Sequence, residues 1–164
     1  MKKALYLFIS FLCVTSYVSA QQLPSITLKD IDGKTINTAE IENDGKPFVI
    51  SFWATWCKPC LRELNAINEV YEDWQEETGM KLIAVSIDEA QNVNRVKPLA
   101  DRFGWDYEVL LDPNGDLKRA LNAHTPPTVI IFDGKGNIIE TRYGYTDGSE
   151  THIIEKIREL IDEE

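Results

Sequence analysis

Residues 47–60 read PFVISFWATWCKPC, a nearly continuous apolar run that ends in two cysteines separated by two residues. Apolar runs of this kind are typical of a strand buried on both faces of a sheet. A helical pattern starts at Pro59, so the cysteines lie where a buried strand passes into a helix. The stretch predicts an α/β domain that carries a redox-capable pair of thiols at one end of a central strand.

The rest of the chain alternates between strand and helix patterns. Two short segments on either side of Asp32-Gly33 predict a β-hairpin. Further strands are expected at residues 80–87, 107–111, 128–132 and 138–143. Helices are expected at residues 59–78, 91–103 (interrupted at Pro98), 116–122 and 149–161. This order predicts a mixed sheet, parallel in the middle, with helices on both faces and an antiparallel pair at one edge.

The composition indicates one compact globular domain. The chain has 164 residues, of which 43% are hydrophobic and 27% charged, and no repeat or linker divides residues 21–164. Seventeen basic and 27 acidic side chains give a net charge of −10. Because a phosphate backbone would be repelled, we expect no nucleic-acid partner. We expect the domain to be a monomer.

Residues 1–20 have the pattern of a cleaved signal peptide. Lys2 and Lys3 precede an apolar run of about eleven residues, and Val18-Ser19-Ala20 supplies a small-x-small cleavage site. The run is shorter than the roughly 20 residues that a membrane-spanning helix needs. An uncleaved membrane anchor is the competing interpretation.

Cleavage would change the cysteine count from three to two. It would remove Cys13 and leave Cys57 and Cys60 as the only cysteines of the mature domain, residues 21–164. The sequence therefore predicts a single redox-active pair in a periplasmic or other extracytoplasmic compartment, where disulfides form.

The position of the pair predicts a different role for each cysteine. A thiolate at a helix N-terminus faces unpaired N–H groups and the positive end of the helix dipole, which lower its pKa. Lys58 adds a positive charge, and Pro59 is tolerated in the first helical turn. We therefore expect Cys57 to be the attacking thiolate, and the more buried Cys60 to resolve the mixed disulfide.

Three other kinds of site are compatible with a cysteine pair. A structural disulfide closing so short a loop would contribute only about 2 kcal/mol. Zinc needs four ligands, and the remaining candidates, His124 and His152, are 28 residues apart, which matches no common spacing. A Cu(I) carrier that uses both thiolates and His124 remains an alternative. The preferred interpretation needs no metal or cofactor.

Residues 52–60, FWATWCKPC, resemble the active-site segment of thioredoxin-fold proteins, and more narrowly that of the TlpA/ResA group of exported thiol–disulfide oxidoreductases. Residues 26–34, ITLKDIDGK, are similar to the hairpin that this group adds at its N-terminus. Pro127-Thr128 resembles the cis-proline site, and residues 132–136 resemble the turn that follows it. The resemblance covers the mature chain in order and implies a thioredoxin-like fold for it.

The resemblance also implies a substrate groove. Pro127 would be cis and lie against the sulfurs, where a substrate strand docks, and Trp56 would contact the substrate. Family members usually have an N–H on the residue before the cis-proline, and this group bonds the substrate backbone. Pro126 has no N–H, so we expect one docking hydrogen bond to be missing.

Exchange also needs a group that takes the proton from the second thiol. Thioredoxins use a buried aspartate on the preceding strand, and Ser51 occupies that position here. The TlpA/ResA group instead tends to carry a glutamate three residues after the second cysteine, and Glu63 stands there.

The helical pattern supports Glu63 independently. Glu63 lies about 60° from the apolar stripe of its helix, which consists of Cys60, Leu64, Ile67, Tyr71 and Trp74. A half-buried carboxyl at that edge would have a raised pKa, and an exposed surface carboxylate is the alternative. Asn65 replaces the proline that often kinks this helix in the family, so we expect a straighter helix.

These features predict an exported protein disulfide oxidoreductase. The resemblance implies the reducing direction, with exported proteins such as apocytochrome c as substrates and a membrane-bound electron donor. A disulfide oxidase or isomerase with the same residues is the alternative, because known CxxC proteins span about 150 mV in potential. A peroxidase is disfavoured, because Ala54 stands where the peroxidatic Thr-x-x-Cys pattern requires threonine.

Overall fold

The computed structural model describes residues 21–162, so the expected signal peptide at residues 1–20 lies outside the described residues. The strands are β1 (Thr27–Asp30), β2 (Thr35–Asn37), β3 (Phe48–Trp53), β4 (Lys81–Ser86), β5 (Glu108–Leu111), β6 (Thr128–Phe132) and β7 (Ile138–Tyr143). The helices are α1 (Lys58–Asn68), α2 (Tyr71–Thr78), α3 (Val96–Phe103), α4 (Asp116–Ala120) and α5 (Thr151–Asp162), with 3-10 turns at Thr38–Glu40 and Val93–Arg95. Across this part of the chain, every helix is too short or too polar to span a bilayer.

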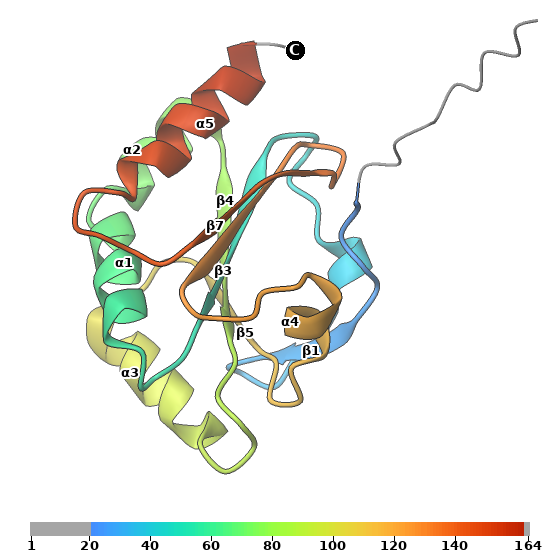
Figure 1. The fold of residues 1–164 in the computed structure, drawn as a ribbon, viewed down its shortest axis with the longest axis vertical. Coiled ribbons are helices and arrows are strands. Elements are labelled where there is room, and N and C mark those ends of the chain that lie inside the picture. The colour runs from blue at the N-terminus through green and yellow to red at the C-terminus, as the bar shows by residue number, and fades with distance from the viewer. Residues whose placement is uncertain (1–20, 163–164) are drawn as a thin grey trace, which may run out of the picture.

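The seven strands form one mixed sheet in the order β2-β1-β5-β4-β3-β6-β7. Strands β3, β4 and β5 are parallel, whereas β6, β7 and the hairpin β1–β2 pair antiparallel with their neighbours. All six residues of β3 are buried, which fits its central place in the sheet (Figure 1). The expected mixed sheet, its parallel centre and its N-terminal hairpin are confirmed.

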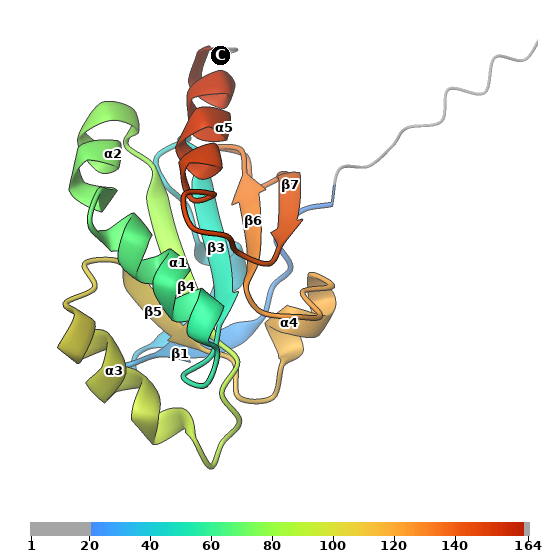
Figure 2. The ribbon, with the colours of Figure 1, turned by 60° about the vertical axis from the view of Figure 1, so that its left-hand side comes forward.

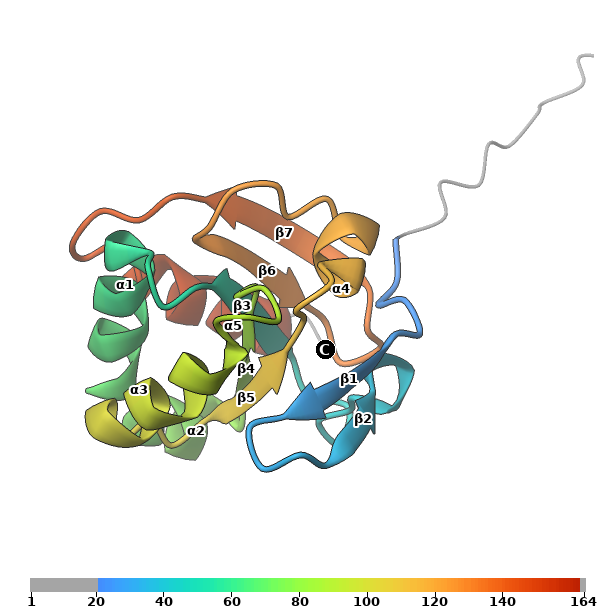
Figure 3. The ribbon, with the colours of Figure 1, turned by 90° about the horizontal axis from the view of Figure 1, so that it is seen from below.

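Helices cover both faces of this sheet. One face packs against α1, α2, α3 and α5 around a core that includes Val49, Trp53 and Val129. The other face packs against α4 around a second core that includes Ile50 and Phe52. Figure 2 shows α1 and α5 in front of β3 and β6, and Figure 3 shows α4 on the side away from α1 and α3. The thioredoxin-like layering expected from the sequence is confirmed.

The single helix expected at residues 59–78 is wrong, because the chain forms two helices with a break at Glu69 and Val70. Val70 has φ −124° and ψ 3°, outside the helical region. The side chain of Asn68 bonds the loop after α3, donating to the carbonyl oxygen of Gly104 (3.2 Å) and accepting from the N–H of Asp106 (3.2 Å). These contacts hold the end of α1 in place while the apolar stripe continues into α2.

A straighter helix was expected because Asn65 replaces a proline, but residues 58–78 are still divided into two helices. Asn65 has a tertiary role instead, because its Oδ1 accepts a hydrogen bond from Nε1 of Trp105 (2.8 Å). The expected interruption at Pro98 is also wrong. Pro98 is the third residue of α3, where its missing N–H removes no bond within the helix.

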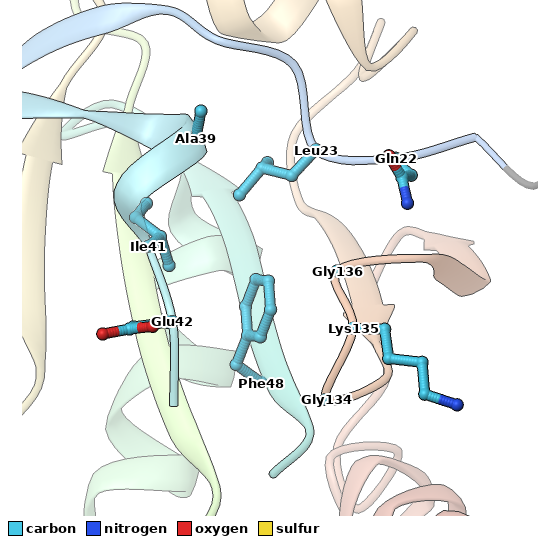
Figure 4. A pocket seen from close by; sticks show the side chains of 9 residues that line it. All are labelled: Gln22, Leu23, Ala39, Ile41, Glu42, Phe48, Gly134, Lys135 and Gly136. Carbon is cyan, nitrogen blue, oxygen red and sulfur yellow. The ribbon is translucent and has the colours of Figure 1, made fainter. Parts of the chain in front are cut away.

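Gly134 allows two loops to meet at the end of the sheet opposite the cysteines. A Cβ at this position would lie 1.7 Å from the backbone oxygen of Gly45. Figure 4 shows Gly134 in this region, beside a recess that Leu23, Ile41 and Phe48 line. Phe48 opens β3, whereas the cysteines follow the other end of that strand.

We expect Gly134→Ala to lower the free energy of unfolding by about 2–3 kcal/mol. The new methyl group would collide with the backbone of Gly45, and that backbone would have to move. The measurement is urea unfolding followed by tryptophan fluorescence. Lys135→Ala changes an exposed neighbour in the same turn and should stay within about 0.5 kcal/mol of the wild type. Equal midpoints for the two variants would show that the close approach carries no energetic weight.

Candidate active site

Cys57 and Cys60 are joined in a disulfide with a Cα–Cα distance of 5.3 Å. Cys57 is the N-cap residue of α1, and its sulfur accepts a hydrogen bond from the backbone N–H of Cys60 (3.3 Å). Cys60 is fully buried, and Cys57 is 4% exposed. The sulfur of Cys57 therefore lies at the positive end of the helix dipole, where a thiolate is stabilised.

Asp88 fixes the loop that leads to this pair. Its buried carboxylate accepts hydrogen bonds from the N–H of Thr55 (2.8 Å), from the hydroxyl of Thr55 (2.6 Å) and from the hydroxyl of Ser86 (2.9 Å). The end of β4 is thereby tied to the loop that carries Cys57. We did not single out Asp88 from the sequence, although a charged residue two positions after a buried strand was a signal.

Trp56 and Pro126 line one surface groove, together with His124 and Lys118. The side chain of Trp56 is 63% exposed although it lies beside the cysteine pair in the sequence. The bond between Pro126 and Pro127 is cis, as the resemblance implied. Pro127 is buried, and its carbonyl oxygen accepts from the N–H of Gly144 (2.9 Å). The exposed indole and the proline loop thus belong to one concave surface.

Glu63 is more deeply placed than the half-buried position expected from the helical pattern. Only 4% of the residue is exposed, so the alternative of a surface carboxylate is wrong. The hydroxyl of Ser51 on β3 donates a long hydrogen bond to Oε2 of Glu63 (3.5 Å). Burial raises the pKa of Glu63 to about 7, against the lowering effects of Ser51 and Arg142, while Glu150 adds to the rise. This carboxyl can therefore gain or lose a proton near neutral pH, one helical turn from Cys60.

The two histidines do not gather at the cysteines. His124 is exposed on the loop before the prolines, and Nε2 of His152 lies 3.0 Å from Oε1 of Glu140 on β7. Between residues 21 and 162, no three histidine, cysteine, aspartate or glutamate side chains cluster in a way that could hold a metal ion. The donor set that the copper alternative needs is therefore not assembled by this part of the fold.

Comparison with known proteins gives a consistent result. Residues 19–141 match the model of the AhpC/TSA family. The chain is 29% identical over 143 residues to the thiol-disulfide oxidoreductase ResA of Halalkalibacterium halodurans, an alignment that spans 87% of this chain and 77% of that protein.

Solved structures show the same fold. A thioredoxin-like protein from Porphyromonas gingivalis has 62% identity and a TM-score of 0.76, over 86% of this chain and 92% of that one. A putative thiol:disulfide interchange protein DsbE from Chlorobium tepidum has 19% identity and a TM-score of 0.75, over 87% of this chain and 96% of that one. The chain therefore belongs to the AhpC/TSA family, and its relatives and fold make it a thioredoxin-like thiol–disulfide oxidoreductase.

Proposed function

We propose that the protein reduces disulfides in exported proteins by dithiol–disulfide exchange. The observation that carries the proposal is the position of Cys57 as the cap of α1, where its sulfur already accepts a helix N–H. The groove that contains Trp56 and Pro126 would hold the substrate as an extended segment. The assignment of Cys57, Cys60, Glu63, Trp56, Pro126 and Pro127 to the site is part of this proposal.

The reaction proceeds in two displacements. The thiolate of Cys57 attacks one sulfur of the substrate disulfide, which forms a mixed disulfide and releases the first substrate thiolate. Cys60 then transfers its proton to Glu63 and attacks the sulfur of Cys57, which releases the second substrate thiolate. Two electrons pass to the substrate, the substrate sulfurs take up protons, and the enzyme ends with the Cys57–Cys60 disulfide. A donor dithiol must then reduce the enzyme before the next cycle.

The expected cellular setting follows from the N-terminal pattern and from the relatives. We propose that the signal peptide is cleaved, that the domain works outside the cytoplasm as a monomer, and that a membrane-bound donor reduces it. Disulfides of apocytochrome c are one candidate substrate. The similarity to proteins named ResA supports this setting.

The midpoint potential tests the direction of electron flow. Equilibration with glutathione should give a value near −270 mV for a reductase, whereas a value near −120 mV would assign the protein to the oxidases.

In an insulin-reduction assay with dithiothreitol, Cys57→Ser should abolish the activity. Retained turnover in that variant would rule out Cys57 as the nucleophile.

We expect Glu63→Gln to slow the resolution of the mixed disulfide by roughly tenfold or more at pH 8, because the amide cannot accept the proton of Cys60. In the wild type, the rate should rise as the carboxyl deprotonates around pH 7. That step should be missing from the variant. Single-turnover kinetics between pH 5 and 9 provide the measurement, and an unchanged profile would exclude Glu63 from proton transfer.

The stability of the oxidised protein serves as the control for this variant. Because folding raises the pKa of Glu63 from 4.5 to about 7, the folded state binds the proton more tightly than the unfolded state. This tighter proton binding contributes about 3 kcal/mol to the free energy of unfolding below about pH 4.5. The contribution is lost as the pH rises through about 7. Glu63→Gln should not show that loss, so it should be relatively more stable at pH 8.

We expect Pro126→Thr to tighten substrate binding by about two- to tenfold, since it restores one backbone donor and one hydrogen bond contributes about 0.5–1.5 kcal/mol. The measurement is the Kd of a disulfide-containing peptide for a protein that also carries Cys57→Ser and Cys60→Ser. Pro126→Ala supplies the same N–H without the hydroxyl. If only Pro126→Thr binds the peptide more tightly, the effect comes from the threonine side chain. If neither variant binds more tightly, the idea that a docking hydrogen bond is missing in the wild type is refuted.

A further inference from the structure

A row of paired residues crosses three strands beneath Glu63. Ser51 on β3 pairs with Val129 on β6, and Val129 pairs with Arg142 on the edge strand β7. Directly paired residues point to the same face of a sheet, so Arg142 lies on the face that α1 and α5 cover. Two strand spacings separate Ser51 from Arg142 by about 10 Å, which an arginine side chain can largely bridge. The register therefore places the positively charged side chain of Arg142 at the sheet edge on the side of Glu63, whose carboxyl Ser51 contacts.

Arg142 is held in this position by its neighbours. Its Nη1 donates a hydrogen bond to the carbonyl oxygen of Ser149 (3.1 Å), and its Nε lies 3.9 Å from Oε1 of Glu140. The side chain is 32% exposed, so water screens its charge only in part. The guanidinium is thus tied to the segment that joins β7 to α5.

The same segment brings a negative charge toward α1. Figures 1 and 2 show the connection between β7 and α5 passing beside α1, and Oδ1 of Asp147 lies 3.7 Å from Nε of Arg62. Glu150 follows shortly after and lines one surface recess with Ala66, which is three residues beyond Glu63 on α1. The hydroxyl of Tyr145 donates to Oε2 of Glu150 (2.8 Å) and fixes that carboxylate.

The other groups around Glu63 are neutral, apart from Glu140. Ser51 is neutral, the sulfurs are joined in a disulfide, and burial raises the pKa of Tyr107 well above its usual range. The hydroxyl of Tyr107 donates to the carbonyl oxygen of Leu64 (3.1 Å). Glu140 already has two neighbours, because its Oε1 lies 3.0 Å from Nε2 of His152 on α5 and 3.9 Å from Nε of Arg142. Arg142 and Glu150 are therefore the charged side chains that act on Glu63 from the sheet edge and from the start of α5, and they act with opposite sign.

We propose that Arg142 and Glu150 form an opposing pair of positioning residues that adjusts the proton-accepting carboxyl of Glu63 from the corner between β7 and α5. The proposal rests on the role of Glu63 given above. Burial remains the main cause of the raised pKa of Glu63, and the two charges at this corner adjust it in opposite directions. The hydrogen bonds and ion pair of these two side chains are with other residues than the cysteines, so each would act through Glu63.

The two charges predict shifts in opposite directions. Arg142→Gln removes a positive charge and should raise the pKa of Glu63, whereas Glu150→Gln removes a negative charge and should lower it. We expect each shift to be about half a pH unit, because solvent screens both partly exposed side chains. At pH 7 the arginine variant would then resolve the mixed disulfide about twofold more slowly. Arg142→Lys keeps the charge and should largely restore the wild-type value.

The carboxyl can be titrated directly by NMR in the oxidised protein labelled with ¹³C at the glutamate side chains, and Glu63→Gln identifies its resonance. The matched controls are Arg158→Gln and Glu77→Gln, which alter a surface pair with an Nε–Oε1 distance of 2.6 Å. Both controls should leave the Glu63 titration unchanged. Opposite shifts in Arg142→Gln and Glu150→Gln, with matching displacements of the pH–rate profile, support the proposal.

Shifts that are absent, or that have the same sign in both variants, would overturn it. Carboxyl shifts that the pH–rate profile does not follow would also overturn it. The two proposals fail separately, because a pH step that survives Glu63→Gln removes Glu63 from the exchange mechanism. If that step is lost in Glu63→Gln but stays in place in Arg142→Gln and Glu150→Gln, only the role of the β7–α5 corner is refuted.

Discussion

The unpaired N–H groups at the start of α1 are the constraint on which the site depends. The first turn of any helix leaves backbone donors without partners, and a side chain of the N-cap residue usually satisfies one of them. Here the sulfur of Cys57 has that position and accepts from the N–H of Cys60. The contact that begins the helix also stabilises a thiolate, so reactivity and local structure have the same physical cause.

Strand β3 connects this constraint to Glu63, the proposed proton acceptor. Its residues alternate between the two cores, with Val49 and Trp53 on the face of α1 and Ile50 and Phe52 on the other face. Ser51 also points toward α1 and is the polar member of the strand. A buried carboxylate with one long hydrogen bond is poorly compensated for the loss of water, so its proton affinity rises. The same desolvation that raises the pKa of Glu63 to about 7 therefore weakens the folded state when the carboxyl is ionised.

Local patterns were sufficient to predict the elements that this mechanism uses. The apolar run before Cys57 identified the central strand, and the helical period placed Glu63 at the edge of the buried stripe. The break between α1 and α2 was missed because the apolar period continues across it, and because the contacts of Asn68 join segments about 36 residues apart. Asp88 and Arg142 were missed for a related reason. The partners of both side chains depend on strand order and register, which a hydrophobic pattern does not contain.

The fold does not depend on the disulfide for its stability, and this independence permits a catalytic cycle in which the bond opens. The bond joins two residues three positions apart, so opening it releases little conformational freedom in the unfolded chain, about 2 kcal/mol by loop-closure entropy. Both cores are built mainly from side chains of the sheet and helices, and the two cysteines are only two of the many members of the core that α1 covers. We therefore expect reduction to leave the strand order, the cap position and the buried carboxyl in place. A domain that depended on this bond for its stability would lose the geometry of its active site in each turnover.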